Sequence, residues 1–326
     1  LKRFRQWESK TPGHPEYGLT PGVETTTGPL GQGFANAVGM AIAEAHLAAR
    51  FNRPGHAVVD HHTYVLASDG DMMEGISHEA ASLAGHLGLG KLIALYDCNG
   101  ISIDGPTSLT FTENVVARFE GYGWHVRRID GHDMAAVERA LAAARGERDR
   151  PSLIIARTHI GFGSPNRQDT SKAHGEPLGE EEVRLTKERL GWPPELKFHV
   201  PDEVLTRLRR ALALGKAWEA EWNERMAAYE RERPEQAAEF RQALAGELPP
   251  GWDRDLPTFT TDKPVATRAA SGTVLEALVP TVGLLIGGSA DLTPSNNTQI
   301  KGQEPIRRGS FGGRYIHFGV REHAMG

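Results

Sequence analysis

The fold is decided by the stretch Tyr64-Val65-Leu66-Ala67-Ser68-Asp69-Gly70, an apolar run that ends in a carboxylate and a glycine. Its length and composition predict a β-strand. A second run of the same kind, Leu92-Ile93-Ala94-Leu95-Tyr96, leads into Asp97-Cys98-Asn99-Gly100. Polar side chains are therefore expected where both strands end, at the carboxyl edge of an open α/β sheet, which is where such sheets bind ligands.

Asp69 and Asn99 together predict a site for a divalent metal and a diphosphate. One carboxylate, one carboxamide oxygen and a nearby backbone carbonyl leave the other octahedral positions to phosphate oxygens and water, which suits Mg²⁺. Asp-Gly and Asn-Gly are also common turn dipeptides, and a turn explains either one alone. Two of them at consecutive strand ends, with Glu74 nearby and Ile101 and Ile103 following, favour a site.

The order of the elements predicts the fold class. From Thr11 to about Thr158, short β-rich runs alternate with helical stretches, which indicates an α/β domain whose mostly parallel sheet has helices on both faces. The expected strands are residues 64–68, 92–96, 125–129 and 152–158, and the expected helices are residues 74–87, 113–120 and 133–145. Asp133 is the expected N-cap of the last helix.

The rest of the chain predicts helices, a connector and the start of a second, similar α/β domain. Apolar residues at helical spacing indicate amphipathic helices over about 183–246, and Leu248-Pro249-Pro250-Gly251 breaks that pattern. We expect a first domain over 1–235, a connector over 236–262 and a second domain over 263–326, with a helix at 273–278 and a strand at 283–287. A chain that starts at Leu1 and stops at Gly326, directly after a motif, is expected to be an internal stretch of a longer protein.

Composition excludes several classes of protein. The chain has 326 residues, 39% of them hydrophobic, and a net charge of −5, which is typical of a soluble cytoplasmic enzyme and argues against a nucleic-acid partner. A single cysteine, Cys98, rules out an internal disulfide or a cysteine-rich zinc site. The absence of an apolar run of membrane-spanning length predicts no membrane partner.

A glycine-rich loop precedes a helix expected to run to about Arg50. Its sequence is Thr25-Thr26-Thr27-Gly28-Pro29-Leu30-Gly31-Gln32-Gly33, with Pro29 suited to the first helical turn. Such a loop can hold a diphosphate by its backbone N–H groups, although Asn36 stands where a dinucleotide fingerprint needs its third glycine. For this loop alone, a turn before a tightly packed helix is an equally good interpretation.

Three further residues are candidates for chemistry. His14 and His174 lie in Gly/Pro-rich loops, which present side chains outward. Glu322 follows Arg321, and a surface ion pair is the favoured interpretation of that pair alone. The functional alternative is a carboxylate in an apolar pocket that shares a proton with a heterocycle nitrogen.

The full set of motifs resembles the transketolase family, the thiamine-diphosphate-dependent ketol transferases, and especially its bacterial form. The matching segments run through nearly the whole chain in the same order. They are Thr-Pro-Gly-His-Pro-Glu at 11–16, Thr-Thr-Gly-Pro-Leu-Gly-Gln-Gly at 26–33, Asp-Gly at 69–70, Met-Glu-Gly-Ile-Ser at 73–77, Asn-Gly-Ile-Ser-Ile-Asp-Gly at 99–105, Ile-Gly-Phe-Gly-Ser at 160–164, Gly-Gly-Ser-Ala-Asp-Leu-Thr-Pro-Ser-Asn at 287–296 and Arg-Glu-His-Ala-Met-Gly at 321–326.

The resemblance implies a thiamine-diphosphate-binding fold and a set of site residues. The implied metal ligands are Asp69, Asn99 and the backbone carbonyl of Ile101, for Mg²⁺ or for Ca²⁺ or Mn²⁺ in its place. The implied cofactor residues are Gly28, Leu30, Gly70, Glu74, Asn99, Ile103, Ile160, His174 and Glu322. Glu322 would face the aminopyrimidine ring, and residues 263–326 would begin the pyrimidine-binding domain, as residues 1–235 would form the diphosphate-binding domain.

The resemblance also implies the substrate residues and the reaction. The implied substrate residues are His14, His174, Arg268, Asp291 and Ser295, and the implied catalytic residues are Glu322, His14 and His174. The reaction moves a two-carbon ketol unit from a ketose phosphate such as xylulose 5-phosphate to an aldose phosphate such as ribose 5-phosphate, in the pentose phosphate pathway. The partner would be a second copy of the chain, in a homodimer with active sites at the subunit interface.

Two departures and two alternatives complete the expectations. Ser68 stands in place of the first glycine of the family's Gly-Asp-Gly, and a chain that lacks the family's beginning and end is expected to be inactive by itself. A related thiamine enzyme such as dihydroxyacetone synthase would share most of these motifs. A non-catalytic transketolase-like assembly protein is the other alternative, but it would have no chemical need for Asp69, Asn99, His14, His174 and Glu322 together.

Overall fold

The computed structural model describes residues 2–326, which divide into two compact units. The first unit contains the chain up to Ala41 together with His62–Leu208, and the second contains Ile42–His61 and Arg209–Gly326. Helices α1 (Gln32–Phe51) and α8 (Asp202–Glu232) each contribute residues to both units.

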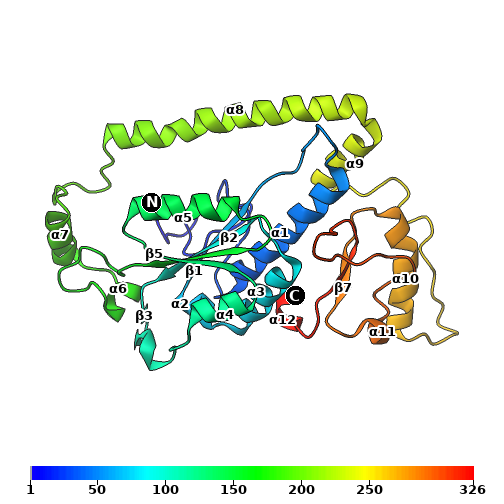
Figure 1. Ribbon diagram of the computed structural model, residues 1–326, viewed down its shortest axis with the longest axis horizontal. Helices are drawn as coiled ribbons and strands as arrows, with labels where there is room; N and C mark the ends of the chain where they lie inside the picture. Colours follow the sequence, from blue (N-terminus) through cyan, green and yellow to red (C-terminus); the bar gives the residue numbers. More distant parts are fainter. Residues whose placement is uncertain (1) are drawn as a thin grey trace. The chain divides into compact units, whose positions relative to one another are not determined.

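A four-stranded parallel sheet forms the centre of the first unit (Figure 1). Its strands are β1 (Thr63–Ser68), β2 (Leu92–Cys98), β6 (Ser152–Arg157) and β5 (His125–Asp130), in that spatial order. The apolar run of β2 is buried on both faces, as parallel strands inside a sheet usually are. The predicted parallel α/β sheet is confirmed, with each strand end within one or two residues of its expected position.

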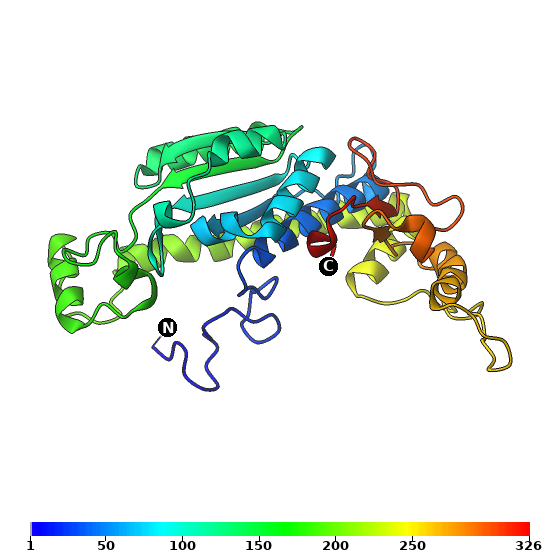
Figure 2. The same cartoon turned by 90° about the horizontal axis from the view of Figure 1, so that it is seen from below.

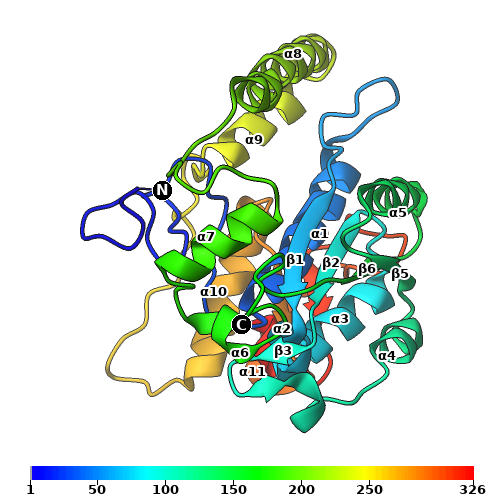
Figure 3. The ribbon, with the colours of Figure 1, turned by 90° about the vertical axis from the view of Figure 1, so that its left-hand side faces the viewer.

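Helices cover both faces of this sheet, as expected. Helix α5 (Met134–Gly146) packs Ala140 and Ala144 against Ile93 and Ile154 on one face. The other face carries α3 (Gly75–Leu87) and α4 (Val115–Gly121), and Figures 1 and 3 show them opposite α5. Asp133 is the N-cap of α5, because its carboxylate accepts from the N–H groups of the first helical turn.

The strand register sets which polar groups meet at the carboxyl edge. In the β1–β2 pair, Ala67 lies beside Tyr96 and Ser68 beside Asp97. A slip of one residue would turn every side chain of a strand to the opposite face, so two packed faces fix this register. The ends of β1 and β2 are therefore held side by side.

The remaining elements of the first unit are short. They are α2 (Asp69–Met73), β3 (Ile101–Ser102), β4 (Gly105–Pro106), a 3₁₀ turn at Thr107–Leu109, α6 (Ser171–Gly175) and α7 (Glu180–Arg189). Figure 2 shows the segment before α1 as turns and loops. The prediction that Pro29 lies in the first turn of α1 is wrong: the helix begins at Gln32, because Gly31 turns the chain with a φ of 77° just before it.

The second unit has its own core and a small parallel sheet. Phe51, Val58, Met226, Tyr229 and Phe240 form the core. Its elements after α8 are α9 (Pro234–Leu244), α10 (Thr267–Thr281), β7 (Gly287–Ser289), α11 (Thr293–Asn296), β8 (Tyr315–His317) and α12 (Glu322–Met325), with β7 parallel to β8.

The second unit and the helices before it differ from the sequence prediction in two details. The strand expected at 283–287 starts only at Gly287, because the N–H of Leu285 bonds to the carbonyl of Val282 in a turn. Helices do fill much of 183–246, but Leu208 and Leu212 on α8 are exposed. Helix α9 crosses the boundary expected at residue 235, and the domain boundaries remain predictions. Over residues 2–326, no helix has the length and apolar character needed to cross a membrane.

Candidate functional site

The carboxyl edge of the sheet brings the two strand-end motifs into contact. Asp69 begins α2 directly after β1, and it is only 3% exposed. One carboxylate oxygen, Oδ2, accepts from the N–H of Gly100 at 2.8 Å. The other, Oδ1, accepts from the hydroxyl of Tyr96 at 2.5 Å. Asp69 therefore lies against the turn that carries Asn99, as expected from the sequence.

Asn99 and Gly100 also form a turn, as the Asn-Gly dipeptide often does. Its carboxamide oxygen accepts from the N–H of Ile101 at 3.0 Å, and Gly100 between them has a φ of 77°. The turn thus presents the side chain of Asn99 and the backbone of Ile101 together, next to Asp69. The turn interpretation and the site interpretation are compatible here.

The donor set fits Mg²⁺ with a diphosphate better than an all-protein metal cage. Within residues 2–326, no three His, Cys, Asp or Glu side chains cluster in a way that could hold a metal ion. The set Asp69, Asn99 and the Ile101 carbonyl offers three oxygens, which leaves positions for phosphate and water. The buried Asp69 carboxylate accepts hydrogen bonds from Tyr96 and Gly100, which are both neutral, whereas buried charges usually pair with an opposite charge or a metal.

Asp71 joins the glycine-rich loop to this edge. Its carboxylate accepts from the N–H of Gly31 and from the N–H of Ser68, both at 2.8 Å. The hydroxyl of Ser68, the N-cap residue of α2, also donates to this carboxylate at 3.1 Å. Sequence reasoning missed Asp71, although the pattern Ser68-x-x-Asp71 is a helix-capping signal. The cap also gives a physical role to the serine that replaces the family's glycine.

Glycines at the site leave room that a side chain would fill. A Cβ added to Gly70 would lie 2.8 Å from Leu30 Cδ1, and one added to Gly28 would lie 3.1 Å from His14 Nδ1. A Cβ on Gly31 would similarly meet Glu74 at 3.0 Å. The structure therefore brings Gly28, Leu30, Gly70 and His14 together beside the Asp69 edge. Leu30 is half exposed, as expected of an apolar residue that a ligand covers.

Ile103, Ile160 and His174 belong to two neighbouring segments of the same unit. Helix α6 carries His174, and a Cβ on the adjacent Gly175 would lie 3.6 Å from Ile103 Cδ1. Ile103 is 69% exposed, which leaves its side chain free to contact a ligand.

The loop that holds Ile160 is closed by a pair that the sequence did not reveal. The Ile160 carbonyl accepts from the N–H of Asp169 at 3.0 Å, and His159 Nδ1 lies 2.8 Å from the Asp169 carboxylate. Asp169 has a φ of 59°, a conformation that Asp tolerates better than most residues. No local sequence signal links two residues ten positions apart in a loop.

The other expected site residues belong to the second unit. Arg268 lies on α10, Asp291 follows β7 with a φ of 62°, Ser295 lies on α11 and Glu322 begins α12. All four are exposed. The loop with Asp291 and Ser295 is ordered by Ser289, whose hydroxyl accepts from Asn296 Nδ2 at 2.8 Å. Because Glu322 is exposed, its neighbours in this chain do not form the apolar pocket expected around it.

Burial and hydrogen bonding set the protonation of the groups behind Asp69. Burial, followed by the hydrogen bond to Asp69, raises the pKa of Tyr96 far above that of an ordinary phenol. Burial also raises the pKa of the Cys98 thiol. Both groups therefore remain protonated at neutral pH, and Cys98 is a poor nucleophile.

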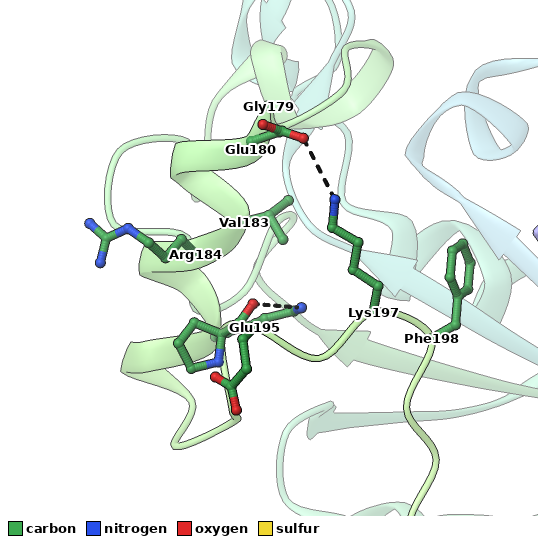
Figure 4. A pocket seen from close by; sticks show the side chains of 9 residues that line it. Gly179, Glu180, Val183, Arg184, Glu195, Lys197 and Phe198 are labelled. Carbon is green, nitrogen blue, oxygen red and sulfur yellow. Dashed lines mark hydrogen bonds and ion pairs between the residues drawn. The ribbon is translucent and has the colours of Figure 1, made fainter.

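A cavity of about 690 Å³ lies beside α7, away from these residues (Figure 4). Val183, Pro194 and Phe198 contribute apolar surface to it. Three of its charged residues have partners within the chain: Lys197 lies 3.7 Å from Glu180, and Lys187 Nζ donates to the carbonyl of Leu196 at 2.5 Å. The cavity contains none of the expected site residues.

Comparison with known proteins decides the family. The description "Transketolase, thiamine diphosphate binding domain" matches residues 1–249, and "Transketolase, pyrimidine binding domain" matches residues 263–326. The chain belongs to the transketolase family. Its resemblance to bacterial transketolases is confirmed by a transketolase of Nostoc, 55% identical over 100% of this chain, and by Transketolase 1 of Escherichia coli, 54% identical over the same share.

Solved transketolase structures have the same fold. A transketolase from Leishmania mexicana is 50% identical and superposes with a TM-score of 0.96 over 99% of this chain and 48% of its own. A transketolase from Pichia stipitis in complex with sedoheptulose-7-phosphate is 47% identical, also with a TM-score of 0.96. The chain spans about half the length of these relatives, with 49% of the Nostoc protein covered.

Proposed function

We propose that this chain is the cofactor-binding part of an active transketolase. The protein would move a two-carbon ketol unit from a ketose phosphate such as xylulose 5-phosphate to an aldose phosphate such as ribose 5-phosphate, in the cytoplasmic pentose phosphate pathway. The observation that carries this proposal is the contact between the buried Asp69 carboxylate and the Asn99 turn, beside a glycine-rich loop tied to the same edge by Asp71.

In this proposal Asp69, Asn99 and the Ile101 carbonyl hold Mg²⁺, for which Ca²⁺ or Mn²⁺ can substitute. Thiamine diphosphate, when bound, supplies the carbanion chemistry of the reaction, and the protein orients it and controls protons. The residues that surround it are Gly28, Leu30, Gly70, Glu74, Ile103, Ile160 and His174. The support for this assignment is that these residues lie in one unit and that a Cβ at Gly70 would already crowd Leu30.

Substrate binding in this proposal uses two histidines, an arginine, a serine and an aspartate. His14 and His174 are exposed imidazoles that can donate to and accept from sugar hydroxyls, and they would hold or move a proton near the transferred carbons. Arg268 suits the substrate phosphate because a guanidinium donates two hydrogen bonds in a fixed plane. Ser295 would contact the same phosphate, and Asp291, also assigned to substrate binding, would lie near the thiazolium end of the cofactor.

The partner in this proposal is a second copy of the chain, and the active sites lie at the subunit interface. Glu322 would act on the cofactor bound by the other subunit by sharing a proton with its ring nitrogen, and Glu74 would belong to the network that connects the two sites. The exposure of Glu322 supports this arrangement, because a carboxylate with that role needs a pocket that its own neighbours do not provide.

Two measurements on the protein at its natural length test the proposal. A coupled assay with xylulose 5-phosphate and ribose 5-phosphate should show ketol transfer that requires thiamine diphosphate, and the absence of transfer would overturn the reaction. Calorimetry should show cofactor binding that depends on Mg²⁺ and weakens by more than about 100-fold in Asp69→Ala, since losing a ligand should cost more than losing its supporting partner. The exposed Asp255→Ala is the control. Metal-independent binding would refute the metal assignment.

A further inference from the structure

Tyr96 is a buried residue with a polar group aimed at the candidate metal site. Its side chain is 2% exposed, and its hydroxyl donates to Asp69 Oδ1 at 2.5 Å. Hydrogen bonds from a neutral hydroxyl to a carboxylate are among the short, strong ones.

The strand register makes this contact a fixed feature of the sheet. Tyr96 lies beside Ala67 in the β1–β2 pair, and Asp69 follows Ala67 by two residues. The Tyr96 ring is packed among buried side chains, so its oxygen has little freedom to move. The position of the hydroxyl is thus set by the core of the unit rather than by a surface loop.

Asp69 depends on its two donors for orientation. The Gly100 N–H holds Oδ2 at 2.8 Å, and the Tyr96 hydroxyl holds Oδ1. With both donors in place the carboxylate is fixed at both oxygens, while each oxygen keeps a further lone pair for a cation. With the hydroxyl removed, one buried oxygen loses its partner and the carboxylate can turn about its remaining bond.

We propose that Tyr96 is a positioning residue of the metal site, whose hydroxyl holds the Asp69 carboxylate in the orientation that a small divalent cation requires. The inference rests on the proposed function, because Asp69 is a metal ligand only there. A residue that hydrogen-bonds to a metal ligand typically contributes a factor of about 10–100 in metal affinity. Tyr96 touches neither the cofactor nor the substrate in this assignment.

Comparing Mg²⁺ with Ca²⁺ distinguishes a loss of Asp69 orientation from a general loss of protein stability. Mg²⁺ requires nearly ideal octahedral geometry, whereas Ca²⁺ accepts irregular geometry and more ligands. A carboxylate free to turn should therefore impair Mg²⁺ more than Ca²⁺. A variant that is merely less stable should lose affinity for both metals to the same extent.

The experiment compares Tyr96→Phe with Tyr64→Phe in the protein at its natural length. Tyr64 lies on the neighbouring strand and is 51% exposed, so its variant makes the same chemical change away from the site. Thiamine diphosphate is titrated calorimetrically while Mg²⁺, or separately Ca²⁺, is varied. We expect Tyr96→Phe to raise the Mg²⁺ concentration needed for half-saturation by about 10–100-fold, with a clearly smaller change for Ca²⁺.

Each outcome is decisive. A change in Mg²⁺ requirement of less than twofold in Tyr96→Phe, or equal losses with Mg²⁺ and Ca²⁺, would overturn the role of Tyr96 and leave the proposed function intact. Failure of the wild-type protein to bind the cofactor with either metal would overturn the proposed function itself and this inference with it. Binding supported by Ca²⁺ in Tyr96→Phe also shows that the variant is folded.

Discussion

At the scale of single residues, the candidate site depends on buried polar groups, such as the Tyr96 hydroxyl, that hydrogen-bond to the proposed ligand residues. Asp69 and Asn99 could be predicted from the sequence because each follows a recognisable strand. Tyr96 could not be assigned in the same way, because it looks like any core residue of an apolar run and its hydroxyl finds a partner only through strand pairing. Ordinary sequence patterns report which face a residue occupies, and they do not report what its polar atom meets.

His46 gives a prediction about pH at this scale. It is 1% exposed, and its Nδ1 lies 2.8 Å from the carbonyl of Phe311. Burial, with the nearby positive charges of Arg50 and Arg314, lowers its pKa. The unfolded chain therefore takes up a proton that the folded chain resists, so the free energy of unfolding should fall as pH drops below about 6.5, the value of an unperturbed histidine.

Urea unfolding at about pH 7.5 and 5.5 measures this effect. His46→Asn keeps a side-chain N–H that can reach the Phe311 carbonyl, and it should reduce the loss of stability at the lower pH. The exposed His61→Asn serves as the control and should leave that loss unchanged. An identical loss in wild type and His46→Asn would show that other groups carry the pH dependence.

At the scale of elements, an exposed contact between His159 and Asp169 closes the loop between β6 and α6, which Ser164 and Asn166 also tie to Glu182 of α7. His159 and Asp169 close residues 160–168 into a loop, with side chains that are 42% and 37% exposed. Exposed pairs contribute only about 0–1 kcal/mol, so Asp169→Asn should change the free energy of unfolding by less than that amount. Asn keeps the preference for the positive φ at this position.

The expected effect of Asp169→Asn is on local motion. Amide hydrogen exchange of residues 160–170 should be several-fold faster, because local opening costs less when the closing pair is weakened. Glu181→Ala removes a comparable exposed partner, that of Arg184 on α7, and should leave exchange in residues 160–170 unchanged. Unaltered exchange in Asp169→Asn would mean that the remaining hydrogen bonds of the loop, to the Ile160 carbonyl and to Glu182, hold it without the His159 contact.

The elements themselves were largely predictable, with failures where local rules compete. Strands β1, β2, β5 and β6 carry the apolar runs of a parallel sheet, and α5 has a clear N-cap. The strand expected at 283–287 failed because an apolar run of that length does not show where pairing with a distant strand begins. The start of α1 was misplaced because Pro29 is a good helix starter, while Gly31 adopts a φ that no helix continues.

At the scale of the whole molecule, the proposed homodimer makes a prediction about mixed variants. If each active site combines Asp69 of one subunit with Glu322 of the other, Asp69→Ala and Glu322→Gln should each be inactive alone. Unfolding and refolding the two variants together produces mixed dimers, which contain one chain of each variant. In a mixed dimer, one of the two sites has both wild-type residues. Random pairing should recover about a quarter of the wild-type activity, because half of the dimers are mixed and half of their sites are intact.

Recovery should depend on subunit exchange. Mixing the two folded variants without refolding should recover less activity, and sedimentation should show one species of twice the chain mass. No recovery after refolding, with each variant refolding to full yield, would place Asp69 and Glu322 of one site on the same chain. The presence of both family domains could be expected from the motifs at 26–33 and 321–326.

Under the proposed function, the parallel pairing of β1 and β2 also links cofactor supply to the lifetime of the protein. Asp69 and Asn99 are thirty positions apart in the chain, and the paired strands bring Asp69 against the N–H of Gly100, the residue that follows Asn99. A ligand that needs both residues binds the folded protein and has no site on the unfolded one. At a free concentration 100 times its Kd, such a ligand adds about 2.7 kcal/mol to the free energy of unfolding. A cell short of thiamine would then lose the enzyme to proteolysis as well as losing its turnover.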